Sequence, residues 1–168
     1  MTVAVLMGVS GSGKTTIAEG VSRQLGWPLL EGDKFHPPAN VEKMSHGIPL
    51  TDEDRWPWLH AIADTIDAVR GAGGSAVVAC SALKRAYRDV LIGDRPDVVL
   101  VYLQGDKDLI AGRMAARKGH YMPVSLLDSQ FATLEEPGPD EHPITVSIAP
   151  PPAAIIDEVV RRLKEHAA

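Results

Sequence analysis

The hydrophobic residues of this chain gather in five short runs, each followed by a segment whose apolar residues recur every three or four positions. The runs are rich in valine, isoleucine and leucine and lack strict alternation, which is typical of strands that are buried on both faces. We therefore expect a parallel sheet with helices on both sides. The predicted strands are Val3–Met7, Leu29–Leu30, Ala76–Cys80, Val98–Leu103 and Ile144–Ile148.

The segments between and after these runs predict helices. The first, Thr15–Leu25, is closed by Gly26. The second ends at Gly71, and Thr51 with Asp54 resembles a capping box at its start. Strands that alternate with helices predict a doubly wound α/β fold. The other predicted helices are Ala82–Leu91, Asp106–Arg117 and a last one that carries Ile155, Val159, Val160 and Leu163.

A phosphate-binding motif follows the first predicted strand. The stretch Gly8-Val9-Ser10-Gly11-Ser12-Gly13-Lys14-Thr15 fits G-x-x-x-x-G-K-[ST]. Glycines let the backbone curl so that its N–H groups point into one concavity, and the following helix adds the positive end of its dipole. Lys14 would then reach the β- and γ-phosphates of ATP, and the Thr15 hydroxyl would ligate Mg²⁺. The predicted nucleotide-binding residues are Gly8, Val9, Ser10, Gly11, Ser12, Gly13, Lys14, Thr15 and Thr16.

The alternative to this interpretation is a glycine-rich turn that carries a lysine by accident. A strand directly before the motif and a helix directly after it make that alternative improbable, since both belong to the context that phosphate binding requires.

Two connections are longer than a parallel sheet requires. The segments from Asp33 to Ser75 and from Leu103 to Ile144 each hold about 40 residues, whereas a minimal crossover needs about 10–12. In a kinase with a phosphate-binding loop, the natural roles are an acceptor-binding flap, at about 34–58, and a lid over the nucleotide, at about 113–142. The 168 residues suit one domain, 1–168, with both excursions inside it.

Composition narrows the classes of function further. The net charge of −5 argues against general binding of nucleic acid, which usually needs a basic face. The single cysteine, Cys80, allows no internal disulfide and is compatible with a reducing cytoplasm. We expect no signal peptide, because the first residues lack a basic segment, and no membrane span, because no apolar stretch approaches about 20 residues.

The first long connection carries candidates for an acceptor site. Asp33 follows the second predicted strand, at the sheet edge where ligands bind in open α/β folds. It would take a proton from an acceptor hydroxyl or ligate Mg²⁺ through water; the alternative is a turn residue that caps its own loop. His36, Lys43 and Arg55 follow, and together they would hold an anionic acceptor rich in hydroxyls, although each alone is compatible with a solvated surface.

Two pairs of basic residues are spaced four apart. Lys84 and Arg88 would share one helix face near the site, with Ser81 as the helix cap, and would suit a carboxylate or a migrating phosphoryl group. Arg113 and Arg117 would clamp phosphate oxygens from the lid. The alternative for each pair is a solvent-facing basic helix.

Five motifs together resemble the thermoresistant type of gluconokinase, a family of phosphate-loop kinases similar to shikimate and nucleoside-monophosphate kinases. They span nearly the whole chain in order, and the last four are far more specific than the phosphate loop. The motifs are GVSGSGKT at Gly8, EGDKFHPPANVEKM at Glu31, GIPLTDEDRWPWL at Gly47, CSALKRAYRDVL at Cys80 and GHYMPVSLLDSQFATLEEP at Gly119.

This resemblance implies ATP-dependent phosphorylation of D-gluconate to 6-phosphogluconate by a three-layer fold with a five-stranded parallel sheet of order 2-3-1-4-5. It also implies a mobile lid and often a homodimer. Lys14 and Thr15 would handle phosphate and Mg²⁺, Asp33 would be the acceptor-side acid, and Lys14, Arg113 and Arg117 would neutralise charge during transfer. The implied gluconate-site residues are Asp33, His36, Lys43, Arg55, Lys84, Arg88, His120 and Gln130.

Two features qualify these expectations. The third predicted strand ends without an aspartate, so Mg²⁺ would rely on Thr15, water and Asp33. A kinase for another small acid, such as shikimate, would use a similar site, and a non-catalytic nucleotide-binding module would share the phosphate loop. The polar residues between Asp33 and Arg55 argue against the non-catalytic module, because a nucleotide switch needs no such pocket.

Overall fold

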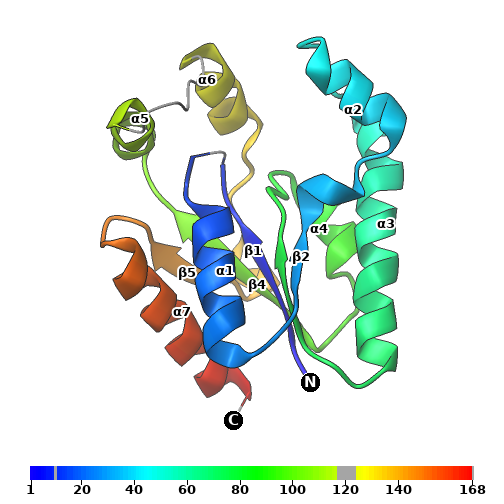
Figure 1. Cartoon of the computed structure of the whole chain (residues 1–168), viewed down its shortest axis with the longest axis vertical. Coiled ribbons are helices and arrows are strands. Elements are labelled where there is room, and N and C mark those ends of the chain that lie inside the picture. Colours follow the sequence, from blue (N-terminus) through cyan, green and yellow to red (C-terminus); the bar gives the residue numbers. More distant parts are fainter. Residues whose placement is uncertain (10, 117–123, 168) are drawn as a thin grey trace.

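A five-stranded parallel sheet lies at the centre of the computed structural model, which describes residues 1–9, 11–116 and 124–167 (Figure 1). The strand order is β2-β3-β1-β4-β5 and every pair is parallel, so the expected order is confirmed. The central strand, β1, pairs with β3 on one side and β4 on the other. The strands are β1 (Val3–Met7), β2 (Leu29–Glu31), β3 (Ala76–Ala79), β4 (Val98–Gln104) and β5 (Ile144–Ser147).

Helices cover both faces of this sheet and rise above its carboxyl edge. α1 packs beside α7 on one face and α3 beside α4 on the other, while α2 and α6 stand above the sheet in Figure 1. In the described part of the chain, no helix combines the length and the apolar character needed to cross a bilayer. The helices are α1 (Lys14–Leu25), α2 (Pro38–Ser45), α3 (Asp52–Gly71), α4 (Arg85–Leu91), α5 (Lys107–Ala116), α6 (Val124–Thr133) and α7 (Pro152–Ala167), with short 3₁₀ turns η1 (Gly32–Phe35) and η2 (Pro139–Glu141).

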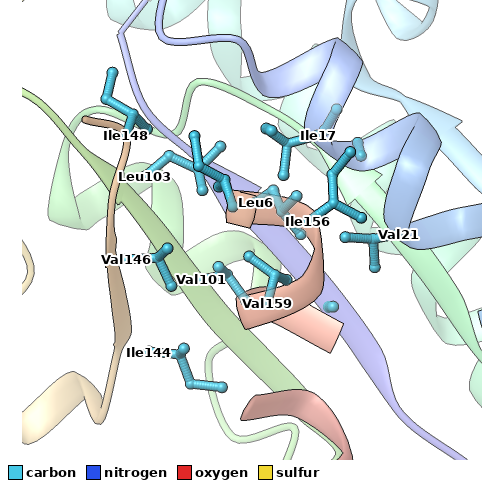
Figure 2. Close-up of a cluster of buried hydrophobic side chains, with 14 of the residues drawn as sticks. Leu6, Ile17, Val21, Val101, Leu103, Ile144, Val146, Ile148, Ile156 and Val159 are labelled. Carbon is cyan, nitrogen blue, oxygen red and sulfur yellow. The ribbon is translucent and has the colours of Figure 1, made fainter. Parts of the chain in front are cut away.

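The alternation of side chains along each strand divides the core into two clusters. Leu6 of β1 belongs to the cluster under α1 and α7, whereas Val5 and Met7 belong to the cluster under α3 and α4. Figure 2 shows the first cluster, in which strand residues meet Ile156 and Val159 of α7. Full burial of a side chain of this size contributes about 1.5–3 kcal/mol. The sheet is therefore held rigidly from both sides, and its carboxyl edge is a fixed platform.

A close approach between α1 and α7 depends on a glycine. A Cβ atom at Gly20 would lie 2.3 Å from Cδ1 of Ile156, well inside van der Waals contact. The two helices can pack at this distance because Gly20 carries no side chain. This contact fixes α1, and with it the loop that precedes α1.

The start of one helix agrees with the sequence expectation and the start of another differs from it. The capping box at the start of α3 is confirmed, since the Thr51 hydroxyl accepts from the Asp54 N–H at 3.2 Å and the Asp54 carboxylate accepts from the Thr51 N–H at 2.9 Å. The predicted helix Ala82–Leu91 begins only at Arg85, so the expectation that Ser81 caps it is wrong. Ala82, at a φ of 44°, turns the backbone away from helical geometry first. Helices α2 and α6 were not predicted from the sequence.

Candidate active site

A cavity of about 710 Å³ opens at the carboxyl edge of the sheet, between the start of α1 and the two elements that rise above it. Lys14 and Thr15 line it from the phosphate loop, and Asp33 lines it from η1. Arg55 lines it from α3, and Gln130 lines it from α6. Residues about 115 positions apart in the sequence therefore share one space, as expected for the ligand-binding edge of an open α/β sheet.

The phosphate loop has the conformation that its glycines predict. Gly11 and Gly13 adopt positive φ values of 83° and 89°. Gly13 is the N-cap of α1 and provides no side-chain hydrogen bond, so the first N–H groups of the helix are not capped by a side chain. The ammonium of Lys14 donates to the carbonyls of Gly8 at 2.9 Å and Val9 at 3.3 Å. Burial lowers the pKa of Lys14, which favours contact with a phosphate that compensates its charge.

Two further details fit the loop to an anion. The hydroxyl of Ser12 is buried and, within the described residues, has no hydrogen-bond partner. A Cβ atom at Gly8 would lie 2.8 Å from that hydroxyl and 3.1 Å from the backbone oxygen of Leu103. A larger residue at position 8 would therefore displace the loop. An unused donor beside uncapped backbone N–H groups is what binding of phosphate oxygens requires.

The acidic side of the site is built by η1, which follows β2. Asp33 is exposed and lines the same cavity as Lys14. The turn lies tightly against β3, because a Cβ atom at Gly32 would come within 2.7 Å of the Ala79 oxygen. Trp58 holds the same turn from α3, since its indole N–H donates to the Gly32 carbonyl at 2.7 Å. Asp33 therefore stands on a backbone that is fixed from two sides.

His36 also lines the cavity. Its ring stacks on Trp58 with 4.3 Å between centroids and 15° between planes. Burial lowers the pKa of His36, Asp33 opposes this and Arg55 adds to it. The imidazole is thus neutral at neutral pH.

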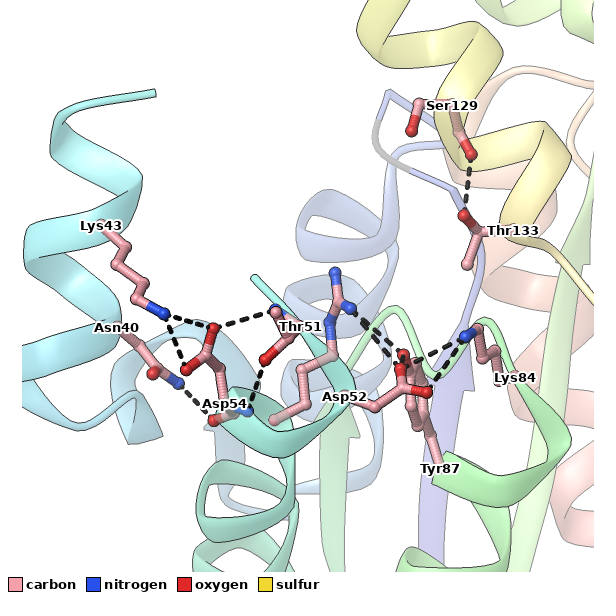
Figure 3. Close-up of polar contacts among 10 residues, drawn as sticks. Asn40, Lys43, Thr51, Asp52, Asp54, Lys84, Tyr87, Ser129 and Thr133 are labelled. Carbon is pink, nitrogen blue, oxygen red and sulfur yellow. Dashed lines mark hydrogen bonds and ion pairs between the residues drawn. The ribbon is translucent and has the colours of Figure 1, made fainter. Parts of the chain in front are cut away.

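A cluster of charged and aromatic groups surrounds Arg55. Its Nη1 donates to the Tyr87 hydroxyl at 3.2 Å, and the Tyr87 hydroxyl donates to Asp52 at 2.6 Å. Lys84 also binds the Asp52 carboxylate, at 3.2 and 3.3 Å, as Figure 3 shows. The hydrogen bond from Tyr87, followed by that from Lys84, lowers the pKa of Asp52. Asp52 is therefore paired with Lys84 at 3.2 Å and, less closely, with Nη1 of Arg55 at 3.9 Å. Within the described residues, Nε and Nη2 of Arg55 make no hydrogen bond.

The remaining predicted acceptor-side cations are paired elsewhere. Lys43 binds both carboxylate oxygens of Asp54, at 3.0 and 2.8 Å, and holds α2 to the start of α3 (Figure 3). Neither Lys43 nor Lys84 is among the cavity-lining residues. Lys84 is the extended N-cap of α4 and not part of the helix, so the predicted helix face shared with Arg88 does not exist.

Arg88 is buried in an ion pair away from the cavity. Its side chain is 1% exposed and donates to both carboxylate oxygens of Glu141, at 2.7 and 3.2 Å, and to the carbonyls of Ala82 and Leu83. It does not line the cavity. The guanidinium therefore joins α4 to the segment that returns from α6, a structural contact that the sequence analysis did not foresee, and its binding of the acceptor stays a prediction that this geometry does not favour.

The predicted lid residues are only partly described. Arg113 donates to the backbone oxygens of Ala149 and Pro150, beyond β5, and does not line the cavity that contains Lys14. Arg117 and His120 lie outside the described residues, as does Ser10 of the phosphate loop.

Several cavity residues were not predicted as site residues, among them Tyr87, Trp58 and Thr133. The sequence did not indicate Tyr87 and Trp58 as site residues, because an aromatic residue in a helix usually signals core packing. Thr133 lies on α6, which was not predicted.

The loop, the uncapped helix and the acid across the cavity define a phosphate-loop kinase. A family model described as "AAA domain" matches residues 3–137, from β1 to the segment after α6. The chain is 51% identical to a gluconokinase from Gluconobacter oxydans over 95% of this chain and 90% of that one. It is 43% identical to the thermoresistant gluconokinase of Escherichia coli, over 97% of this chain and 94% of the other.

A solved structure agrees with these relatives. The crystal structure of a gluconokinase from Sinorhizobium meliloti matches with a TM-score of 0.88 and 45% identity, over 99% of this chain and 95% of that one. The chain belongs to the gluconokinase family.

Proposed function

We propose that the protein transfers the γ-phosphoryl group of ATP to a hydroxyl of D-gluconate and so forms 6-phospho-D-gluconate. The observation that carries this proposal is the single cavity in which the phosphate loop, Asp33 and Arg55 meet. The first binds a polyphosphate, the second accepts a proton, and the third offers a fork that matches a carboxylate. The names of the relatives support gluconate as the acceptor.

Among the acceptor-side residues, Arg55 is best suited to bind the carboxylate of gluconate. Lys43, Lys84 and Arg88 each bind an acidic partner at 3.2 Å or less, whereas Arg55 lies 3.9 Å from Asp52 and keeps donors that no described residue occupies. Its Nη1 is held by Tyr87, so the orientation of the fork is set before a ligand binds. Pre-set donors bind an anion with less loss of side-chain entropy.

Asp33 would orient the terminal hydroxyl and accept its proton. Negative charge develops on the phosphoryl group during transfer, and the Lys14 ammonium would stabilise it. The ammonium is bound to a carbonyl oxygen of its own loop, so it would exchange that contact for one with the phosphoryl group. The Thr15 hydroxyl, which lines the cavity, would hold Mg²⁺, and this ion supplies charge neutralisation at the phosphates when it is bound. α6 would cover the transfer and exclude water, which otherwise competes with the acceptor.

ADP release with and without gluconate tests this function. We expect ADP release that depends on gluconate and is much slower with shikimate or with another sugar acid. Preference for another acid would keep the kinase and replace the substrate. ATP binding without ADP release on any acid would overturn the enzymatic function. The homodimer implied by the family resemblance and the cytoplasmic location suggested by the single cysteine remain predictions.

A further inference from the structure

A buried amide contacts the ring of His36. Asn40 lies on α2 and is 3% exposed. Its Nδ2 donates to the backbone oxygen of Asp54 at 2.8 Å and lies 3.3 Å from Nδ1 of His36. A buried polar side chain that spans two elements in this way has a defined orientation, because an unsatisfied amide would be costly.

The orientation of the Asn40 amide follows from its partner on α3. The Asp54 carbonyl oxygen can only accept a hydrogen bond, so the amide must present its nitrogen and not its oxygen to that carbonyl. The same nitrogen then directs its second hydrogen to His36. Only an unprotonated Nδ1 can accept that hydrogen, so the ring proton resides on Nε2.

The rest of the surroundings keeps the ring neutral and fixed. Stacking on Trp58 sets the plane of the ring, and the Trp58 indole is itself held by the Gly32 carbonyl. Burial and Arg55 both lower the pKa of His36, against the opposing charge of Asp33. Nδ1 is occupied by Asn40, and no described residue is hydrogen-bonded to Nε2. The ring lines the acceptor side of the cavity.

We propose that Asn40 is a positioning residue that fixes His36 as the Nε2–H tautomer, so that His36 donates a hydrogen bond to an oxygen of the acceptor. In this state His36 cannot take the proton of the attacking hydroxyl, because the nitrogen that is open to a ligand already carries one. The base role then falls to Asp33. The identity of the acceptor rests on the proposed function, whereas the tautomer does not.

Nuclear magnetic resonance of the full chain tests the tautomer directly. With ¹⁵N-labelled histidine, long-range ¹H–¹⁵N correlations report the protonation of each ring nitrogen. The chain has six histidines, and the signal that disappears in His36→Gln identifies His36. We expect an unprotonated Nδ1 and a protonated Nε2. A proton on Nδ1 in the wild type overturns the proposal.

Asn40→Asp supplies the matched perturbation, since it has nearly the same shape but can only accept at this position. We expect the ring proton to move to Nδ1, or both nitrogens to become protonated. An unchanged Nε2–H tautomer in a folded Asn40→Asp variant would show that Asn40 does not set it. If this variant does not fold, the wild-type spectrum still decides the tautomer, and the kinetics of two His36 variants still decide whether His36 acts as a donor.

The two variants of His36 distinguish a hydrogen-bond donor from a general base. The amide nitrogen of glutamine reaches the place of Nε2, whereas that of asparagine reaches only the place of Nδ1, and neither is a base. We expect His36→Gln to keep the KM for gluconate within about threefold and His36→Asn to raise it about ten- to hundredfold, the usual effect of losing a hydrogen bond to a polar ligand. The KM for ATP should not change in either. Equal and complete loss of kcat in both variants would make His36 the base and overturn the proposal. A wild type that ignores gluconate contradicts the proposed function instead and leaves the spectroscopic result standing.

Discussion

Replacing Arg88 by methionine tests whether the buried guanidinium stabilises the fold or binds the acceptor. Arg88 is 1% exposed and Glu141 is 10% exposed, so the substitution leaves a carboxylate that is almost fully buried without its partner. It also removes the donors to the Ala82 and Leu83 carbonyls, which lie 2.9 and 3.2 Å away. Breaking one side of a buried ion pair costs about 3–5 kcal/mol.

This cost is large against a typical total stability of about 5–15 kcal/mol, but it leaves a folded protein to measure. Urea denaturation should show the loss as a lower midpoint with an unchanged slope, and the melting temperature should fall by about 6–20 °C. The matched control is Arg85→Met, which breaks the pair with Asp140 on the surface. Pairs as exposed as this one contribute about 1 kcal/mol or less.

The double variant Arg88→Met with Glu141→Leu completes the test. We expect it to be more stable than Arg88→Met alone, because it buries no unpaired charge. The KM for gluconate of folded Arg88→Met should stay within a few-fold of the wild type. A loss of less than about 1 kcal/mol together with a large rise in this KM would refute the assignment and restore Arg88 to the acceptor site.

Five further substitutions test the fold and the chemistry. Gly20→Ala should lower the free energy of unfolding by about 1–3 kcal/mol despite the helix preference of alanine, and Ile156→Val should restore part of the loss; greater stability in Gly20→Ala would contradict the packing. The pKa of Asp54 is about 2 instead of 3.8, chiefly through the hydrogen bond from its lysine partner. The stability that this carboxylate contributes is therefore present above about pH 4 and lost as the pH falls towards 2, so wild type and Asp54→Asn should converge over that range in acid denaturation; a constant difference would disprove it. Lys14→Ala should abolish nearly all gluconate-dependent ADP release. Asp33→Asn should lower kcat sharply while ATP still binds, and near-normal turnover would remove Asp33 from the base role.

The sheet was predictable because its signal is local. Runs such as Val3–Met7 and Val98–Leu103 are apolar on both faces, and burial on both faces is what an inner parallel strand requires. The phosphate loop was equally predictable, since its conformation depends on glycines only two or three positions apart. α2 gave no such signal. Its one buried residue is Asn40, while Val41 and Met44 are exposed, so no apolar stripe marks it as a helix.

The ion pairs could not be predicted from the sequence, for a different reason. Lys43 meets an acid 11 positions away, Lys84 one 32 positions away, and Arg88 one 53 positions away. Each of these cations looks equally suited to an anionic ligand when only its own helix is considered. Their partners are decided by how α3, α4 and the segment before β5 pack, which no local pattern contains.

These pairings bear on the selectivity that we propose for the cavity, since Arg55 is the only arginine among its described lining residues. If Lys43, Lys84 and Arg88 all faced the cavity together with Arg55, the acceptor side would attract any polyanion, including the phosphorylated product. Because each of the three is neutralised by a neighbouring acid, Arg55 stands beside a neutral His36 and a hydroxyl from Tyr87. One fork with hydroxyl and imidazole groups around it matches a single carboxylate on a chain of hydroxyls. The long-range ion pairs, which no local sequence pattern indicates, thus leave Arg55 as the basic residue that we propose binds the substrate carboxylate.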